Sequence, residues 1–442
     1  MKRNSSNSIK SILDIELKKI SPSDEEIKKI NDYLRGFVSK ISNEIKMGEI
    51  DAEIFLGGSF AKNTVVVRNG EEFSYDVDLF IRYDKKYNDK NISEITEKIL
   101  NVIKLDFIKL HGSRDYFRVN ASGNLGVKFY TEIIPVIKVK NPKDAFNITD
   151  LSYSHVNYIK RKIKNKKILD DIKLSKQFAY ACNSYGAESY IRGFSGYGLE
   201  LLTFKYGSFL KMLKEISKTK EKEKLIIDIE KHYRNKQSIM IDVNSSKLSS
   251  PIILIDPVYK QRNVLAALND ETFIRFKKHA RGFLKKPSLK YFEIEKKDIN
   301  KIKKDSIKKK YEFVQIELKT EKQEGDVAGS KLLKFNNFIL NEIDKYFDIK
   351  DKGFIYDDKQ SAKIYIVAKK EKEILISGPS IEMNNNCDSF KKAHKKTFVK
   401  NKRLFAKEKI NFGLKDFIVN WKSKNNKIIK DMSVSEFKIL NY

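Results

Sequence analysis

The chain contains very little cysteine. Only Cys182 and Cys387 occur among its 442 residues, which excludes a disulfide framework and a zinc site built from cysteines. This usage is typical of a reducing compartment, so we expect a cytoplasmic location. No apolar run is long enough to span a membrane. The first segment, MKRNSSNSIKSILD, lacks the apolar core of a secretory signal. We therefore expect no membrane partner.

Several common nucleotide-binding signatures are also absent. The sequence contains no P-loop, no Rossmann glycine fingerprint and no clean internal repeat. Its length of 442 residues and its hydrophobic content of 40% are nevertheless sufficient for folded cores. At about 100–200 residues per domain, we expect two to four domains.

Acidic residues are in the minority. There are 89 Lys and Arg residues against 59 Asp and Glu residues, which gives a net charge of +30. Such a charge favours a polyanionic partner such as a nucleic acid. All but 13 of the basic residues are lysine, so AT-biased coding is an alternative origin of the charge, and many lysines can be simple solvated surface. The charge indicates a nucleic-acid partner only when a catalytic motif accompanies it.

Two carboxylates share one face of a predicted strand. In the segment from Tyr75 to Ile81, alternate side chains point to opposite sides. Asp76 and Asp78 therefore point to one side, and the apolar residues between them point to the other, toward covering helices. Neighbouring carboxylates repel each other unless a cation lies between them. Because Mg²⁺ binds through one or two carboxylates together with substrate phosphates, we predict a magnesium site here.

A glycine turn precedes this strand. An apolar strand ending at Leu56 leads into Gly57-Gly58-Ser59, whose backbone N–H groups and hydroxyl can bind a phosphate. Each feature alone is weak, and a solvated acidic strand beside a glycine turn is the alternative interpretation. Their order and spacing together resemble the nucleotidyltransferase superfamily of DNA polymerase beta-like enzymes.

A third acidic residue lies in an apolar segment. In the strand predicted near residues 127–139, Glu132 shares a face with Ile134 and Val136. Acidic residues are rarely buried unless they are paired or bound to a metal. Glu132 is therefore the candidate for a third carboxylate.

The rest of the chain alternates helices and strands. Apolar periodicity predicts two helices within residues 5–47, separated at Ser21-Pro22-Ser23, with either serine as the N-cap of the second. Further helices are predicted near 92–109, over 154–184 and over 271–283. An amphipathic helix is predicted after the glycine-rich turn that follows Arg192. After Pro287 the composition becomes charged and aliphatic. The alternation of short β-rich runs and Lys-rich helices in the last third of the chain predicts an α+β module with an RNA-binding sheet.

Segments along most of the chain resemble one family, the archaeal, class I CCA-adding enzymes. These tRNA nucleotidyltransferases build the 3′ CCA end without a nucleic-acid template. The resemblance rests on GGSFAKNT, YDVDLF, YGAESYIRGFSGYGLELL, IDPVYKQRNVLAAL, KKPSLKYF and ISGPSIEMNNNCDSFKKAH. It implies addition of C, C and A to tRNA from CTP and ATP, with Mg²⁺ as cofactor, and suggests a homodimer. Another template-independent enzyme, such as a poly(A) polymerase, and a catalytically dead RNA-binding module are the alternatives.

The resemblance also implies an α+β multidomain fold. We expect a DNA polymerase beta-like nucleotidyltransferase head over residues 1–150 and a helical central domain for nucleotide and base recognition over 151–285. An α+β body and tail that bind tRNA would occupy residues 286–442.

Residue roles follow from the same resemblance. It implies that Asp76, Asp78 and Glu132 are catalytic and hold the metal ions, and that Glu132 accepts the hydroxyl proton. The residues that it implies for binding ATP or CTP are Ser59, Lys62, His155, Lys176, Tyr185 and Arg262. The family usually has Glu at the position of Asp76, Asp at that of Glu132, and Arg at that of Lys62. We hypothesise that these two differences compensate each other, because the longer Glu132 and the shorter Asp76 side chains can together reach the same pair of metal ions.

Overall fold

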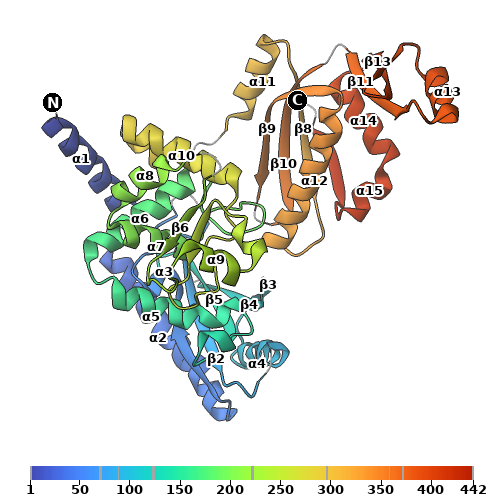
Figure 1. The fold of residues 1–442 in the computed structure, drawn as a ribbon. Coiled ribbons are helices and arrows are strands. Elements are labelled where there is room, and N and C mark those ends of the chain that lie inside the picture. Colours follow the sequence, from blue (N-terminus) through green and yellow to red (C-terminus); the bar gives the residue numbers. More distant parts are fainter. Residues whose placement is uncertain are drawn as a thin grey trace. The chain divides into compact units, whose positions relative to one another are not determined.

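A computed structural model describes residues 2–68, 72–87, 89–121, 125–220, 223–294, 297–357, 359–370 and 373–440 (Figure 1). The chain forms two compact units, residues 1–295 and 296–442. Both units combine helices with sheets, so the predicted α+β multidomain class is confirmed. The predicted division into three parts, with boundaries at residues 150 and 285, stays a prediction.

The first unit is built on a five-stranded sheet. Its strands lie in the order β1 (Ala52–Leu56), β2 (Tyr75–Tyr83), β5 (Phe129–Ile137), β4 (Asp115–Ala121) and β3 (Ile108–His111). β2 and β5 run parallel, and the other neighbours run antiparallel. Val77, Leu79 and Ile81 of β2 are fully buried on one face, as their alternation with Asp76 and Asp78 predicts.

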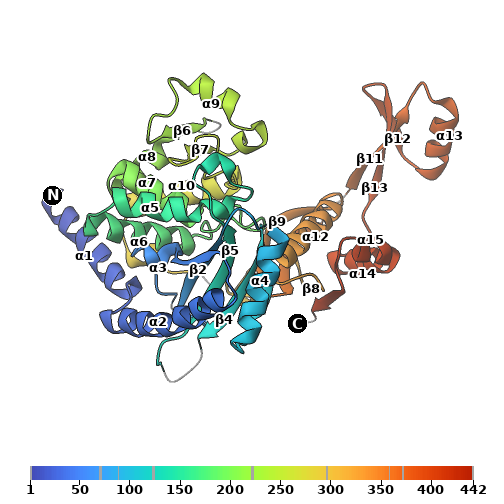
Figure 2. The same ribbon diagram turned by 90° about the horizontal axis from the view of Figure 1, so that it is seen from below.

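Two helices cover this apolar face, α2 (Asp24–Met47) and α4 (Asp89–Val102) (Figure 2). Of the two predicted N-caps of α2, Ser23 is the one used. Its Oγ accepts the Glu26 N–H at 3.2 Å, while the Glu26 carboxylate accepts the Ser23 N–H at 2.8 Å. Helix α4 ends before residue 109, the predicted end, because Lys104 adopts a left-handed conformation (φ 52°) and the chain then enters β3.

The remainder of the first unit is mainly helical. Its elements are α1 (Lys2–Ile20), α3 (Gly58–Ala61), α5 (Ser152–Lys162), α6 (Lys166–Ala181), α7 (Gly196–Tyr206), α8 (Phe209–Lys218), α9 (Lys236–Asp242), α10 (Asp270–Lys285) and the parallel pair β6 (Leu225–Asp228) and β7 (Ile252–Ile255). Phe178 of α6 lies at the centre of its core, with the rings of Phe209, Phe276, Phe283 and Phe292 within 5.4–5.7 Å. The predicted helix over 271–283 is confirmed as α10.

Two predictions in this part are wrong. The single helix expected over 154–184 is two helices, because Asn165 caps α6 by accepting the Lys167 N–H at 2.9 Å. The helix after the glycine-rich turn, α7, is not amphipathic, since every residue from Gly198 to Thr203 is buried. The amphipathic helix is the next one, α8, which buries Phe209, Met212, Leu213 and Ile216.

The second unit contains two small sheets. One has the order β14 (Glu436–Leu440), β8 (Glu312–Lys319), β10 (Ser361–Lys370) and β9 (Phe347–Tyr356), and the other has β11 (Glu373–Ser380), β13 (Arg403–Lys409) and β12 (Thr397–Lys400). The helices are α11 (Ile299–Lys308), α12 (Asp326–Asp344), α13 (Asn384–Ala393), α14 (Leu414–Lys424) and α15 (Asn426–Asp431). Among the described residues of both units, no helix has the length and apolar character needed to cross a membrane.

Candidate active site

The three predicted carboxylates lie on two adjacent parallel strands. The register of β2 and β5 pairs Asp78 with Glu132, and Asp76 precedes Asp78 on the same face of β2. Burial, together with the nearby charges of Asp76 and Glu132, raises the pKa of Asp78 to about 8. Burial also raises the pKa of Glu132, although Arg118 opposes the shift. The site therefore disfavours three simultaneous negative charges.

These carboxylates fit a divalent cation. Oxygen donors are the ligands that Mg²⁺ prefers, and a cation would remove the repulsion that raises the pKa of Asp78. In the structure, arginines provide part of the balancing charge: Arg118 Nη2 lies 3.0 Å from Glu132 Oε1, and Arg68 Nη2 lies 4.0 Å from Asp76 Oδ2. Within the described ranges, no three His, Cys, Asp or Glu side chains are grouped as a metal site. The carboxylates would therefore have to turn toward a shared ion.

The predicted glycine turn is in fact a turn followed by the short helix α3, and it lies directly against β2. The Gly57 N–H donates to the Asp78 carbonyl at 2.8 Å. Gly58 has a φ of +61°, and a Cβ at this position would lie 1.6 Å from Asp78 Oδ2. Only glycine permits both this left-handed conformation and this close approach. The turn can therefore hold Ser59 beside the carboxylates.

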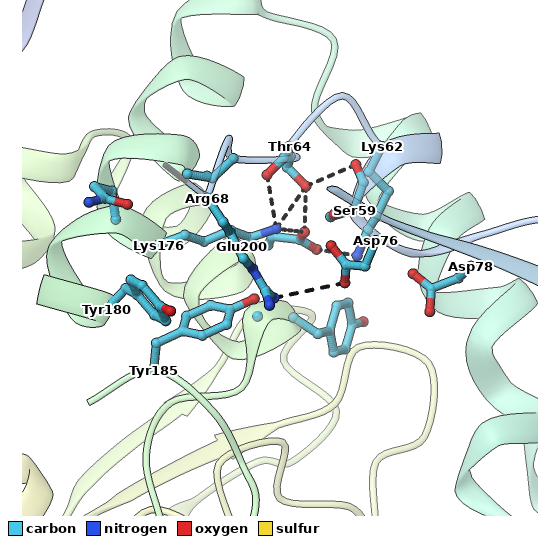
Figure 3. Close-up of a pocket in the computed structure, with 14 residues that line it drawn as sticks. Ser59, Lys62, Thr64, Arg68, Asp76, Asp78, Lys176, Tyr180, Tyr185 and Glu200 are labelled. Carbon is cyan, nitrogen blue, oxygen red and sulfur yellow. Dashed lines mark hydrogen bonds and ion pairs between the residues drawn. The ribbon is translucent and has the colours of Figure 1, made fainter. Parts of the chain in front are cut away.

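A cavity of about 170 Å³ opens between the carboxylate strand and the helices (Figure 3). Six of the nine predicted site residues line it, namely Ser59, Lys62, Asp76, Asp78, Lys176 and Tyr185. They come from β2, from the segment around α3, from α6 and from the chain just after α6. The cavity thus has a carboxylate wall and a wall of lysine and tyrosine side chains.

Two lysines of the cavity share one carboxylate that the sequence did not identify. Glu200 of α7 is completely buried. Its Oε2 accepts from Lys62 Nζ at 2.7 Å, and its Oε1 accepts from Lys176 Nζ at 2.8 Å and from Thr64 Oγ1 at 2.7 Å. Burial alone would raise the pKa of Glu200, but the two ammonium groups lower it to about 2. Glu200 stands in the apolar segment GLELL, so the reasoning applied to Glu132 could have found it.

Three predicted residues do not line this cavity. Glu132 lies on β5 beside Asp78, and the other two, His155 and Arg262, gather around a second buried acid. Asp256 Oδ2 lies 2.8 Å from His155 Nε2 and accepts from Arg262 Nη1 at 2.8 Å. Burial opposes ionisation of Asp256, yet these partners lower its pKa to about 2. Burial is also the main reason that the pKa of His155 is lowered. Neither His155 nor Arg262 lines the cavity, but Tyr197 does, and its ring lies 4.4 Å from the His155 ring. Asp256 was not predicted.

The chain is similar in sequence to several known proteins. Residues 170–293 match the family described as tRNA nucleotidyltransferase, second domain. The chain is 33% identical over 381 residues to a CCA-adding enzyme of Nanoarchaeum equitans (strain Kin4-M), which covers 85% of this chain and 86% of that protein. It is 27% identical over 410 residues to a CCA-adding enzyme of Methanocaldococcus jannaschii, with coverages of 90% and 87%.

A solved structure of Cid1, described with its RNA terminal uridylyl transferase activity, is similar to the chain with a TM-score of 0.50. The sequence identity is 14%, and the match covers 66% of this chain and 99% of that one. At this identity the likeness shows a shared fold alone.

Proposed function

The chain belongs to the CCA-adding enzymes, and we propose that it adds C, C and A to the 3′ end of tRNA from CTP and ATP and releases pyrophosphate. The observation that carries the proposal is the 33% identity to a CCA-adding enzyme over 381 residues. Neither unit alone contains 381 residues, so the similarity extends over both. A pocket with a carboxylate wall and a lysine wall suits a metal-dependent reaction of a nucleoside triphosphate.

Asp76, Asp78 and Glu132 would hold Mg²⁺. When bound, Mg²⁺ supplies Lewis acidity toward the 3′-hydroxyl and neutralises charge on the leaving pyrophosphate. Ser59 and Lys62 would bind the phosphates of the incoming nucleotide. Glu132 would accept the proton of the tRNA 3′-hydroxyl on Oε2, since its Oε1 accepts from Arg118 Nη2 at 3.0 Å.

Base selection would depend on the cluster at Asp256. His155, Arg262 and Tyr197 all lie against this carboxylate, so their donors and acceptors are fixed in direction. A fixed polar set rejects a wrong base because buried polar groups would then be left unpaired. Because His155 and Arg262 do not line the cavity and Tyr197 does, we expect the cluster to act on the nucleotide through Tyr197, whose ring lies 4.4 Å from the His155 ring.

The acceptor stem of tRNA would be bound mainly through its phosphates and 2′-hydroxyls. Such contacts read the A-form shape of the stem and not its sequence. The lysine-rich second unit is the proposed surface for them. A homodimer is a further prediction, which the mass of the protein in solution would test.

The decisive experiment uses a tRNA transcript that lacks CCA. The transcript is incubated with the protein, Mg²⁺ and CTP, with or without ATP, and the products are resolved to one nucleotide. We expect two additions with CTP alone and three with both nucleotides, after which addition stops. A poly(A) polymerase would ignore CTP and continue to add A. Absence of pyrophosphate release on this tRNA would indicate a catalytically dead RNA-binding module.

A further inference from the structure

The residue that unites the two lysines of the cavity is Glu200. Its carboxylate bonds to Lys62, Lys176 and Thr64 at 2.7–2.8 Å, and its side chain is fully buried. The four groups come from three separate segments: the loop after α3, helix α6 and helix α7. Two ammonium groups facing one carboxylate leave an excess positive charge at the wall of the cavity. That wall is suited to an anionic ligand.

The two lysines are not equivalent in this network. Lys176 Nζ donates to Glu200 Oε1 at 2.8 Å, to Thr64 Oγ1 at 2.9 Å and to the Thr64 carbonyl at 3.1 Å. An ammonium group has three N–H donors, so the protein itself occupies all of them. Among the described residues, Lys62 Nζ donates to Glu200 alone. Two of its N–H groups therefore remain for a ligand.

We propose that Glu200 is a positioning residue that directs Lys62 toward the phosphates of the incoming nucleotide, while Lys176 and Thr64 hold the Glu200 carboxylate in place. Glu200 itself would not touch the substrate. This inference rests on the proposed function, since it concerns the triphosphate of CTP or ATP. It assigns the orientation of Lys62 to Glu200.

The chemistry of Lys62 explains why such a partner is needed. An ammonium on a four-carbon stem is a mobile point charge, whereas a guanidinium has a fixed planar set of donors. Burial lowers the pKa of Lys62, and Glu200 opposes that shift. A carboxylate at 2.7 Å therefore supplies both a direction and a charge partner that the lysine lacks by itself.

The test measures equilibrium binding of CTP and of CMP, without tRNA and with Mg²⁺ present. We expect Glu200→Gln to weaken CTP binding about ten- to hundredfold, the range expected when one charge-assisted hydrogen bond is lost. Binding of CMP, which lacks the outer phosphates, should change by less than about threefold. The control is Asp171→Asn on α6, which removes a carboxylate that is also largely buried but does not line the cavity. It should leave both affinities unchanged.

A double-mutant cycle tests whether Glu200 acts through Lys62. If it does, adding Glu200→Gln to Lys62→Met should cause little further loss of CTP affinity. Equal losses for CTP and CMP, or additive losses in the cycle, would overturn the proposal and leave Glu200 as a structural residue. If Glu200→Gln does not fold, the same comparison of CTP and CMP binding is made with Glu200→Asp, which keeps the charge on a shorter side chain. Addition of C to tRNA by the unsubstituted protein tests the proposed function separately.

Discussion

Replacing Gly58 by alanine tests how closely the glycine turn must approach the carboxylate strand. The new Cβ would lie 1.6 Å from Asp78 Oδ2 and 2.5 Å from its Cγ, whereas ordinary contacts begin at 3.4 Å. The Asp78 carboxylate must therefore retreat by roughly 1.8 Å, mostly by side-chain rotation, and the Asp78 Cβ, 3.0 Å away, must also shift slightly. A displacement of about 1 Å at a reacting centre can cost on the order of 100-fold in rate. We expect at least that loss.

Backbone strain contributes separately, because alanine at a positive φ costs roughly 1–2 kcal/mol. Gly207 is the matched control, since its φ is +74° and a Cβ there would meet nothing within 4 Å. Gly207→Ala should therefore lower the unfolding temperature by a few degrees through strain alone, and Gly58→Ala should lower it by at least as much. Only Gly58→Ala should slow single-turnover addition of C to a tRNA that lacks CCA. If the two variants react at similar rates, the close approach of Gly58 to Asp78 has no catalytic importance.

Asp78→Ala should abolish addition but preserve tRNA binding, because tRNA affinity comes from dispersed phosphate contacts; more than a small residual rate would remove Asp78 from the metal site. Glu132→Asp should slow single-turnover addition, and the double change with Asp76→Glu should recover part of the loss, whereas a double variant no faster than the slower single variant would refute compensation. Without metal, the pKa of Asp78 is about 8 in the folded protein, whereas it is near 4 in the unfolded chain. Between these pH values the folded protein binds one proton more than the unfolded chain, so the free energy of unfolding should fall as the pH rises. Mg²⁺ should then raise the unfolding temperature more at pH 8.5 than at pH 6, and Asp78→Asn should remove that difference; a Mg²⁺ effect equal at both pH values would contradict the assignment. The logarithm of tRNA affinity should decrease linearly with the logarithm of salt concentration. A flat response would mean that the residues behind the net charge of +30 do not contact the tRNA phosphates.

The sequence predicted the parts of the site that depend on local geometry. Asp76 and Asp78 could be placed together because a strand repeats every two residues, and Glu132 stood out as an acid in an apolar strand. Both strands are present, and their register brings Asp78 and Glu132 side by side. The N-cap of α2 was likewise narrowed to Ser21 or Ser23 from local sequence, and the structure uses Ser23.

Glu200 stands out as an acid in an apolar segment, but most partners of Glu200 and Asp256 could not be predicted because they are distant in the sequence. Lys62 and Thr64 bond to Glu200 from more than a hundred positions away, and His155 approaches Asp256 in the same manner. No local period carries such information. The break between α5 and α6 was missed for another reason: the lysines on both sides continue a helical composition, and only the side chain of Asn165 marks the new start.

The parallel pairing of β2 with β5 has a consequence for how the protein reaches its native state. Asp78 and Glu132 become neighbours only after the intervening chain has passed through α4, β3 and β4. Pairing between distant segments is slow because the intervening loop must first lose entropy. We therefore expect the carboxylate site to form late in refolding. Magnesium added to the unfolded chain should not accelerate refolding, and it should act only by slowing the unfolding of the finished sheet.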